Sequence, residues 1–196
     1  ILVASLTLVN SPPVWRVTQI SECRKATAID PAWCTQAGNR NFEMLTEFEY
    51  NSNNLLLTKK TVRAGDSNTA IAYSATNTWQ STGYTYDDIG NVVAVDGPRT
   101  DVDDKVYTIY DNRRRPIYEI GADPDGSGTL KRAIIKHSYD ADGRENLTET
   151  GTGSTVVFTA GIPTDVSDFD ALSFNSNSYD PVTGLLVRTD TGYYVP

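Results

Sequence analysis

The sequence has very little of several residue types on which common functional sites depend. It contains one histidine and two cysteines among 196 residues. No second cysteine pair or nearby histidine completes a zinc site, and no Gly-x-Ser-x-Gly motif supports serine-hydrolase chemistry. No apolar run approaches the roughly 20 residues that a membrane helix needs. We therefore expect a chain that is not an enzyme and has no membrane span.

Positive charge is also scarce, because 17 Lys and Arg residues stand against 25 Asp and Glu residues. The net charge of −8 argues against nucleic acid or an anionic membrane as a partner. Tyr, Thr, Val, Ile, Asp, Asn and Gly are frequent instead, and this mixture favours strands and tight turns over helices. The composition predicts an all-β fold.

Short β-rich segments run through the chain, and clusters of Gly, Asp, Asn and Pro separate them. The segments span residues 15–20, 91–95, 105–110, 116–120, 131–139, 155–159 and 185–189. Only the stretches 26–36 and 166–172 are candidates for helices, and neither has a clear 3.6-residue stripe. This pattern predicts antiparallel hairpins.

A motif of tyrosine, aspartate and glycine recurs five times. The copies begin at Tyr50, Tyr86, Tyr110, Tyr139 and Tyr179. Aspartate follows in four copies, as Asp87, Asp111, Asp140 and Asp180, and glycine completes three of them, as Gly90, Gly143 and Gly184. The copy at Tyr110 lacks the glycine, and the copy at Tyr50 lacks both residues. There we expect Asn54 to take the place of the glycine, because asparagine tolerates a left-handed conformation.

Each residue of the motif has a physical role in a β-hairpin. The tyrosine ends a strand and packs on the sheet, the aspartate caps the turn through its side chain, and the glycine supplies a positive φ. The motif therefore predicts turns near residues 50–55, 86–91, 110–115, 139–144 and 179–185. We expect residues 1–196 to form a single sheet segment of successive hairpins.

The stretches "YDDIGNVVAVDGP", "YDNRRRPIYEIGADPDG" and "YDADGRENLTETG" resemble the YD repeat of the Rhs family, which also includes Tc-toxin shell components and teneurins. The resemblance covers nearly the whole chain. It implies an extended, curved antiparallel sheet that spirals, in whole proteins, into a hollow shell around a toxic domain or other cargo. A complete shell needs many more than five repeats, so the resemblance implies a fragment of a longer chain.

The resemblance also implies where the chain works and with what. It implies a bacterial protein that is secreted or held at the cell surface, with further repeats of the same chain and a toxin cargo as partners. Unpaired edge strands predict self-association as well. The alternative is a carbohydrate- or partner-binding β module, for which Trp15, Trp33 and Trp79 are the side chains of interest.

Cys23 and Cys34 lie close together in the sequence. A single close pair in an acidic, strand-rich chain predicts a disulfide in an oxidising compartment. Two unpaired thiols are the alternative.

An acidic loop at residues 123–130 resembles part of an EF-hand calcium loop. Asp123, Asp125 and Ser127 occupy its first, third and fifth positions. Ile134 stands at the twelfth, where a bidentate glutamate is required, and strands are expected on both sides. We therefore expect a long hairpin connection and no cofactor, and a weak calcium site stays open as the alternative.

His137, the only histidine, lies two residues before a motif tyrosine. Other copies have Phe48, Tyr84, Thr108 or Asn177 at that position, on the same sheet face as the tyrosine. We expect His137 to pack or to bond between strands, without a catalytic role.

Three further charged groups are expected to be structural. Arg113–Arg115 and the acidic residues at 101, 103 and 104 are interpreted as solvated charges with cross-strand pairing. Asp190-Thr191-Gly192 matches an aspartic-protease tripeptide, but a second copy is missing, and a turn at a strand end explains it better. Asp180-Pro181 fits the repeat, so no self-cleavage is inferred from it.

Overall fold

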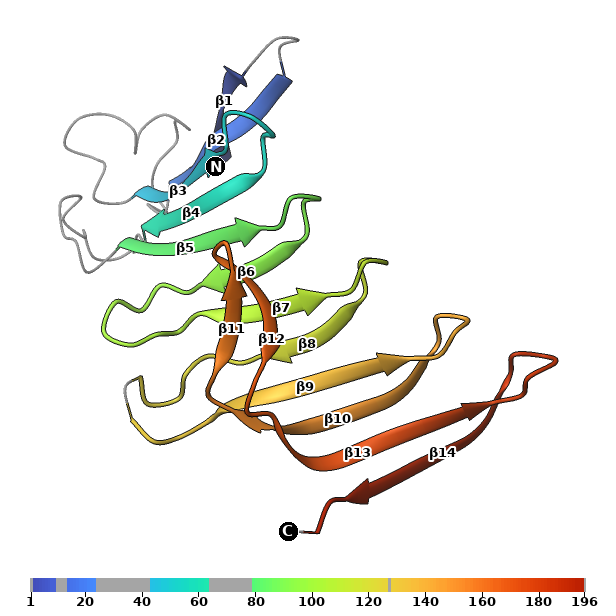
Figure 1. Cartoon of the computed structure of the whole chain (residues 1–196). Coiled ribbons are helices and arrows are strands. Elements are labelled where there is room, and N and C mark those ends of the chain that lie inside the picture. The colour runs from blue at the N-terminus through green and yellow to red at the C-terminus, as the bar shows by residue number, and fades with distance from the viewer. Residues whose placement is uncertain (1, 10–13, 24–42, 64–78, 127, 196) are drawn as a thin grey trace. The chain divides into compact units, whose positions relative to one another are not determined.

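The computed structural model describes residues 2–9, 14–23, 43–63, 79–126 and 128–195, and every regular element in them is a β-strand. No helix among these residues is long and apolar enough to cross a membrane. The chain forms two compact units, Ile1–Tyr84 and Thr85–Pro196 (Figure 1).

The first unit is an antiparallel meander in which each strand pairs with the next along the chain. Its strands are β1 (Leu2–Val9), β2 (Val14–Cys23), β3 (Glu43–Tyr50), β4 (Leu57–Arg63) and β5 (Trp79–Tyr86), whose last two residues belong to the second unit. Leu45 is fully buried there, beside Glu43, which accepts a hydrogen bond from the Ser21 hydroxyl (2.6 Å).

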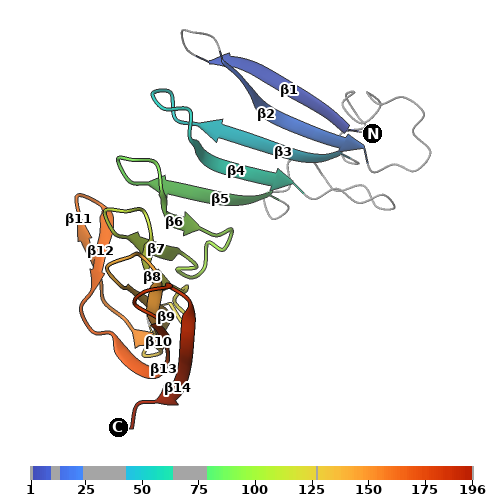
Figure 2. The same ribbon diagram turned by 90° about the vertical axis from the view of Figure 1, so that its right-hand side faces the viewer.

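The second unit continues the same pattern of antiparallel neighbours. Its strands are β6 (Val92–Asp96), β7 (Val106–Tyr110), β8 (Pro116–Ile120), β9 (Arg132–Tyr139), β10 (Glu145–Gly153), β13 (Asp170–Tyr179) and β14 (Leu186–Tyr193). Between β10 and β13 the chain leaves the sheet to form a separate hairpin of β11 (Val156–Thr159) and β12 (Ile162–Val166). In both views this hairpin stands beside one face of the sheet (Figures 1 and 2).

The β11–β12 hairpin closes the core of the second unit. Val166 packs with Ile109, Ile120 and Ile134, and all four side chains are buried. Each such burial contributes about 1.5–3 kcal/mol. Gly153 makes the close approach possible, because a Cβ there would lie 2.8 Å from the Ile134 side chain.

Aromatic pairs extend this packing across the same face. Tyr107 meets Phe158 edge to face with ring centroids 5.5 Å apart, and Tyr118 meets Phe169 at 6.0 Å. The opposite face of β7–β10 carries Thr108, Glu119, Ile135, His137 and Thr148, as the strand registers require. We call it the open face.

The structure confirms the predicted all-β class and the antiparallel hairpins. The helix candidate at residues 166–172 is not a helix, since Val166 ends β12 and Asp170 begins β13. Between them Asp168 accepts backbone hydrogen bonds from Ser154 and Thr155, which closes the base of the β11–β12 hairpin. The stretch 26–36 lies outside the described residues.

Candidate functional site: the contacts between repeats

The three short motif turns are built on the same backbone hydrogen bonds. The aspartate nitrogen donates to the carbonyl four residues on, as Asp140 does to Arg144 (2.9 Å), and Gly143 donates back to the Asp140 carbonyl (3.0 Å). The turns that begin at Asp87 and Asp111 have the same pair of bonds. The aspartate side chain also accepts N–H groups of its own turn, so it caps the turn as the sequence predicted.

The first and last turns are one residue longer. Asn51 donates to the carbonyl of Leu56 (2.9 Å), and Asp180 donates to that of Leu185 (2.8 Å). The expectation for Asn54 is therefore wrong: Leu55 has the positive φ of 59°, at the position that Gly184 (φ 71°) has in the last copy. Asn54 instead accepts the Leu56 N–H through its side chain. Counting from the longer copy at Tyr179 would have identified Leu55.

The third turn has Arg114 where the other short turns have glycine. Its φ is 66°, a conformation that costs a non-glycine residue roughly 1–2 kcal/mol. Its guanidinium donates to the carbonyl of Ile89 in the preceding turn, so this residue links two repeats.

An aspartate–arginine pair closes two of the turns. Arg115 donates to one carboxylate oxygen of Asp111 through Nε (2.8 Å) and Nη2 (2.6 Å). Arg144 donates to a carboxylate oxygen of Asp140 through Nε (2.7 Å), while its Nη2 donates to Asp142 (2.6 Å). In the copy that begins at Tyr86, Asn91 takes this position and donates to Asp87 (2.7 Å).

Each of these arginines also covers the tyrosine of the next repeat. The Arg115 guanidinium carbon lies 4.1 Å from the ring centroid of Tyr139, and that of Arg144 lies 4.7 Å from the centroid of Tyr179. At this distance the contacts are cation–π interactions. They join hairpins that are successive in the sheet.

The tyrosine hydroxyls complete the contact. Tyr139 donates to the carbonyl of Pro116 and Tyr179 to that of Glu145, both at 2.8 Å, and each acceptor is the first residue of a return strand in the preceding repeat. Tyr50 makes a similar bond to Val17 in the first unit (2.7 Å). We call the set of aspartate, arginine and following tyrosine the inter-repeat clasp.

The motif glycines have a second role in the clasp. A Cβ on Gly143 would lie 3.2 Å from Nη1 of Arg115, and one on Gly184 would lie 3.1 Å from Nη1 of Arg144. The glycine thus leaves space for the arginine of the preceding repeat, besides adopting a positive φ. Sequence reasoning found the positive φ alone, because the space for the arginine depends on contacts between repeats.

The charges of the clasp favour its ionised form. Burial raises the pKa of Asp111, but hydrogen bonds from Arg115 and Arg113 outweigh this and hold the pKa below its usual value. The same balance lowers the pKa of Asp140. Burial, with the charge of Glu145 nearby, raises the pKa of Tyr139, so its hydroxyl keeps the proton that it donates to Pro116.

The acidic loop is held by its own hydrogen bonds and by an arginine. Asp123 accepts the Asp125 N–H (3.2 Å), and Asp125 accepts that of Leu130 (3.0 Å). A second oxygen of Asp123 lies 4.0 Å from Arg132. Ser127 lies outside the described residues, within which no three His, Cys, Asp or Glu side chains gather as a metal site. Calcium binding stays a prediction to be tested.

Arg132 joins the two long connections at the end of the sheet opposite the motif turns. Its side chain is only 7% exposed, and it donates to the carbonyls of Lys105 (2.8 Å) and Gly121 (2.9 Å) and to Asp103 (2.5 Å). Sequence reasoning missed Arg132, since it belongs to no motif.

The remaining charged candidates pair locally. Asp101 pairs with Arg99 (3.1 Å) and Asp103 with Arg132 (2.5 Å), and no ion pair among the described residues joins this acidic cluster to residues 113–115. Asp190 pairs with Arg188 (2.7 Å) inside β14, and the turn expected at residues 190–192 is wrong. Cys34 lies outside the described residues, so the disulfide with Cys23 stays a prediction.

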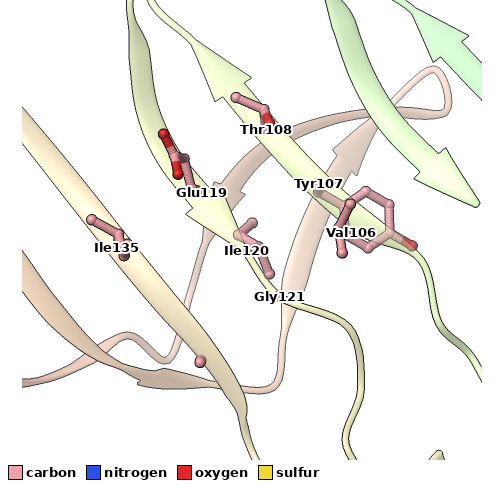
Figure 3. Close-up of a pocket in the computed structure, with 8 residues that line it drawn as sticks. Val106, Tyr107, Thr108, Glu119, Ile120, Gly121 and Ile135 are labelled. Carbon is pink, nitrogen blue, oxygen red and sulfur yellow. The ribbon is translucent and has the colours of Figure 1, made fainter.

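His137 bonds between strands, which is one of its two expected roles. Its Nδ1 lies 2.7 Å from Glu145 on β10. Beside it, the open face has a shallow, mostly apolar hollow of about 360 Å³ (Figure 3). Its lining comes from β7, β8, β9 and the residue after β8, and includes Val106, Thr108, Glu119, Gly121 and Ile135.

Comparisons with known proteins give a weak likeness of fold. No protein-family model and no curated protein matches the chain. A solved structure, "Crystal Structure of TcdB2-TccC3-Cdc42", is similar over 95% of this chain at 14% sequence identity, with a TM-score of 0.49. This chain spans 9% of the length of that one. At this TM-score the likeness supports no inference about function.

Proposed function

We propose that the chain is a non-catalytic structural segment of an Rhs-like protein, secreted or held at the cell surface. It forms part of a β-sheet wall that encloses or presents a toxin or other cargo. The inter-repeat clasp is the observation that carries this proposal. It uses the motif residues themselves to hold one hairpin to the next, so the repeat has a mechanical reason to recur.

The clasp makes the array extendable. The copies at Tyr110 and Tyr139 each supply an arginine and a carbonyl to the tyrosine of the following copy, so these copies join head to tail. Among the described strands, β14 pairs with β13 only and is therefore an edge strand. Its residues Leu186 (56% exposed) and Val187 (68% exposed) are apolar. An exposed apolar edge favours pairing with a further repeat or a second copy.

The full reading frame that contains this chain gives the test. We expect it to contain many further Y-D-x-x-G units and a separate segment enclosed by them. Expressed whole and imaged by electron microscopy, it should form a hollow particle that protects the enclosed segment from protease. A reading frame that contains only these five copies would contradict the proposal. So would a whole protein in which protease cuts the segment that the repeats are expected to enclose.

The carbohydrate-binding alternative needs several exposed aromatic rings in a row. Trp15 is 62% exposed, but Trp79 is half-buried with the Arg63 guanidinium 6.0 Å from its ring, and Trp33 lies outside the described residues. The described aromatics of the first unit therefore do not favour this alternative over the wall.

A further inference from the structure

His137 lies between two carboxylates that belong to different strands. Its Nδ1 is 2.7 Å from Oε1 of Glu145 on β10, and its Nε2 is 3.6 Å from Oε1 of Glu119 on β8. The side chain is 14% exposed, and Nε2 is a buried atom without a hydrogen-bond partner among the described residues. One imidazole on β9 thus faces both neighbouring strands of the open face.

The contact with Glu145 determines which nitrogen carries the proton in the neutral ring. Burial raises the pKa of Glu145, but hydrogen bonds from Thr148 and His137 outweigh this and lower it, so Glu145 is ionised at neutral pH. A carboxylate only accepts hydrogen bonds, and a neutral imidazole has one N–H. The proton is therefore on Nδ1, and Nε2 presents its lone pair towards the Glu119 carboxylate.

A second proton changes this contact from unfavourable to favourable. Imidazolium carries N–H on both nitrogens, so Nε2–H would point at Glu119 while Nδ1–H keeps its bond to Glu145. Glu119 is 53% exposed on its strand and borders the hollow of the open face (Figure 3). It has room to approach the ring, because its carboxylate is at the surface.

The other charged and polar groups near the His137 ring are bound to other partners. Lys136 and Glu149 pair with each other (3.4 Å) on the opposite face of the sheet. Arg115 is bound to Asp111 and covers Tyr139. From β13, Asn177 donates to the backbone carbonyl of Glu145, not to the side chain.

We propose that His137 is a proton-operated switch that ties β8, β9 and β10 together under acidic conditions. Proton uptake adds the Glu119 ion pair to the existing Glu145 bond and so strengthens the sheet between the copies at Tyr110 and Tyr139. The added partner exists only in the folded chain, so the gain is present at low pH and is lost as pH rises through the imidazole range of about 5–8.

The composition allows a pH effect on stability to be assigned to one side chain. His137 is the only histidine. Every carboxylate with a shifted pKa among the described residues has a value below its usual one, namely Asp101, Asp111, Asp140, Asp168, Asp180 and Glu145. Their contributions to stability are present at pH 5.5 and are lost only at lower pH. The chain has no other histidine, so a change in stability between pH 5.5 and 7.0 that disappears in a His137 variant is assigned to this residue.

The experiment compares melting temperatures of the whole chain at pH 5.5 and 7.0, at constant ionic strength. The His137→Phe variant is the matched control, because Phe48 stands at the same motif position. We expect the wild-type chain to gain about 2–4 °C at pH 5.5 beyond any gain of this control. Glu119→Gln should remove most of the extra gain while keeping the Glu145 bond. Equal pH dependence in wild type and His137→Phe would overturn the proposal.

A spectroscopic measurement keeps the proposal testable if the control variant fails to fold. In the wild-type chain at pH 8, imidazole nitrogen shifts in NMR should show the proton on Nδ1. At pH 5.5 both nitrogens should be protonated, and Glu119→Gln should shift the midpoint between the two states to lower pH. A neutral ring with its proton on Nε2, or a midpoint unchanged by Glu119→Gln, would contradict the switch.

Discussion

The two ends of the hairpins in the second unit hold together by different means. At the motif end, the inter-repeat clasp recurs at Arg115 and Arg144, and both guanidinium groups are partly exposed. At the other end, the buried side chain of Arg132 joins two long connections of unequal sequence. The second unit thus combines a repeated, partly exposed contact, the inter-repeat clasp, with a single buried one at Arg132.

The largest effect is expected at the buried end. Arg132→Leu leaves Asp103 and the carbonyls of Lys105 and Gly121 without their donor. Asp103 is 47% exposed and can be hydrated, whereas each carbonyl left without a donor costs about 1–3 kcal/mol, so the free energy of unfolding of the second unit should fall by about 2–4 kcal/mol. Urea denaturation followed by tyrosine fluorescence measures it.

The control for Arg132→Leu is Arg113→Gln, at an exposed turn position. The backbone N–H of Arg113 donates to the Asp111 side chain, and the substitution keeps this bond. Its unfolding midpoint should change little. An equal loss of unfolding free energy in the two variants would contradict the distinction between the two ends of the hairpins.

These two ends also differ in how far the sequence predicts them. The five turns follow from the motif, because each motif residue acts on its own backbone. The clasp does not, since Arg115 and Tyr139 are 24 residues apart in sequence and meet only when hairpins pair. Arg132 has no sequence signal at all, and the β11–β12 hairpin looks like an ordinary connection until it folds over Ile109 and Ile134.

The next largest effect is expected at the clasp. Arg115→Gln removes the paired hydrogen bonds to Asp111 and the contact with the Tyr139 ring, and should cost about 1–2 kcal/mol. Arg115→Lys keeps the charge but not the planar fork, so it should recover only part of that loss. Thermal unfolding of both variants gives the values. Full recovery by lysine would mean that charge alone matters there.

The clasp should also weaken in acid. The pKa of Asp111 is lowered in the folded chain, so its contribution is present above the unfolded value near 3.8 and is lost as pH falls through the lower folded value. The difference in stability between wild type and Arg115→Gln should therefore shrink below pH 4. A difference that stayed constant down to pH 2 would assign the stabilisation to the ring contact.

Calcium should have the smallest effect, because Arg132 already supplies a cation beside the acidic loop. Its guanidinium lies 2.5 Å from Asp103 and 4.0 Å from Asp123, while Asp125 is engaged with the Leu130 N–H. We expect millimolar calcium to leave the melting temperature of the wild-type chain unchanged. In Arg132→Gln the two aspartates lose this charge, and calcium should then stabilise the variant measurably. Stabilisation of the wild type instead would mean that the loop binds calcium despite Arg132, and that the weak site left open by the sequence is real.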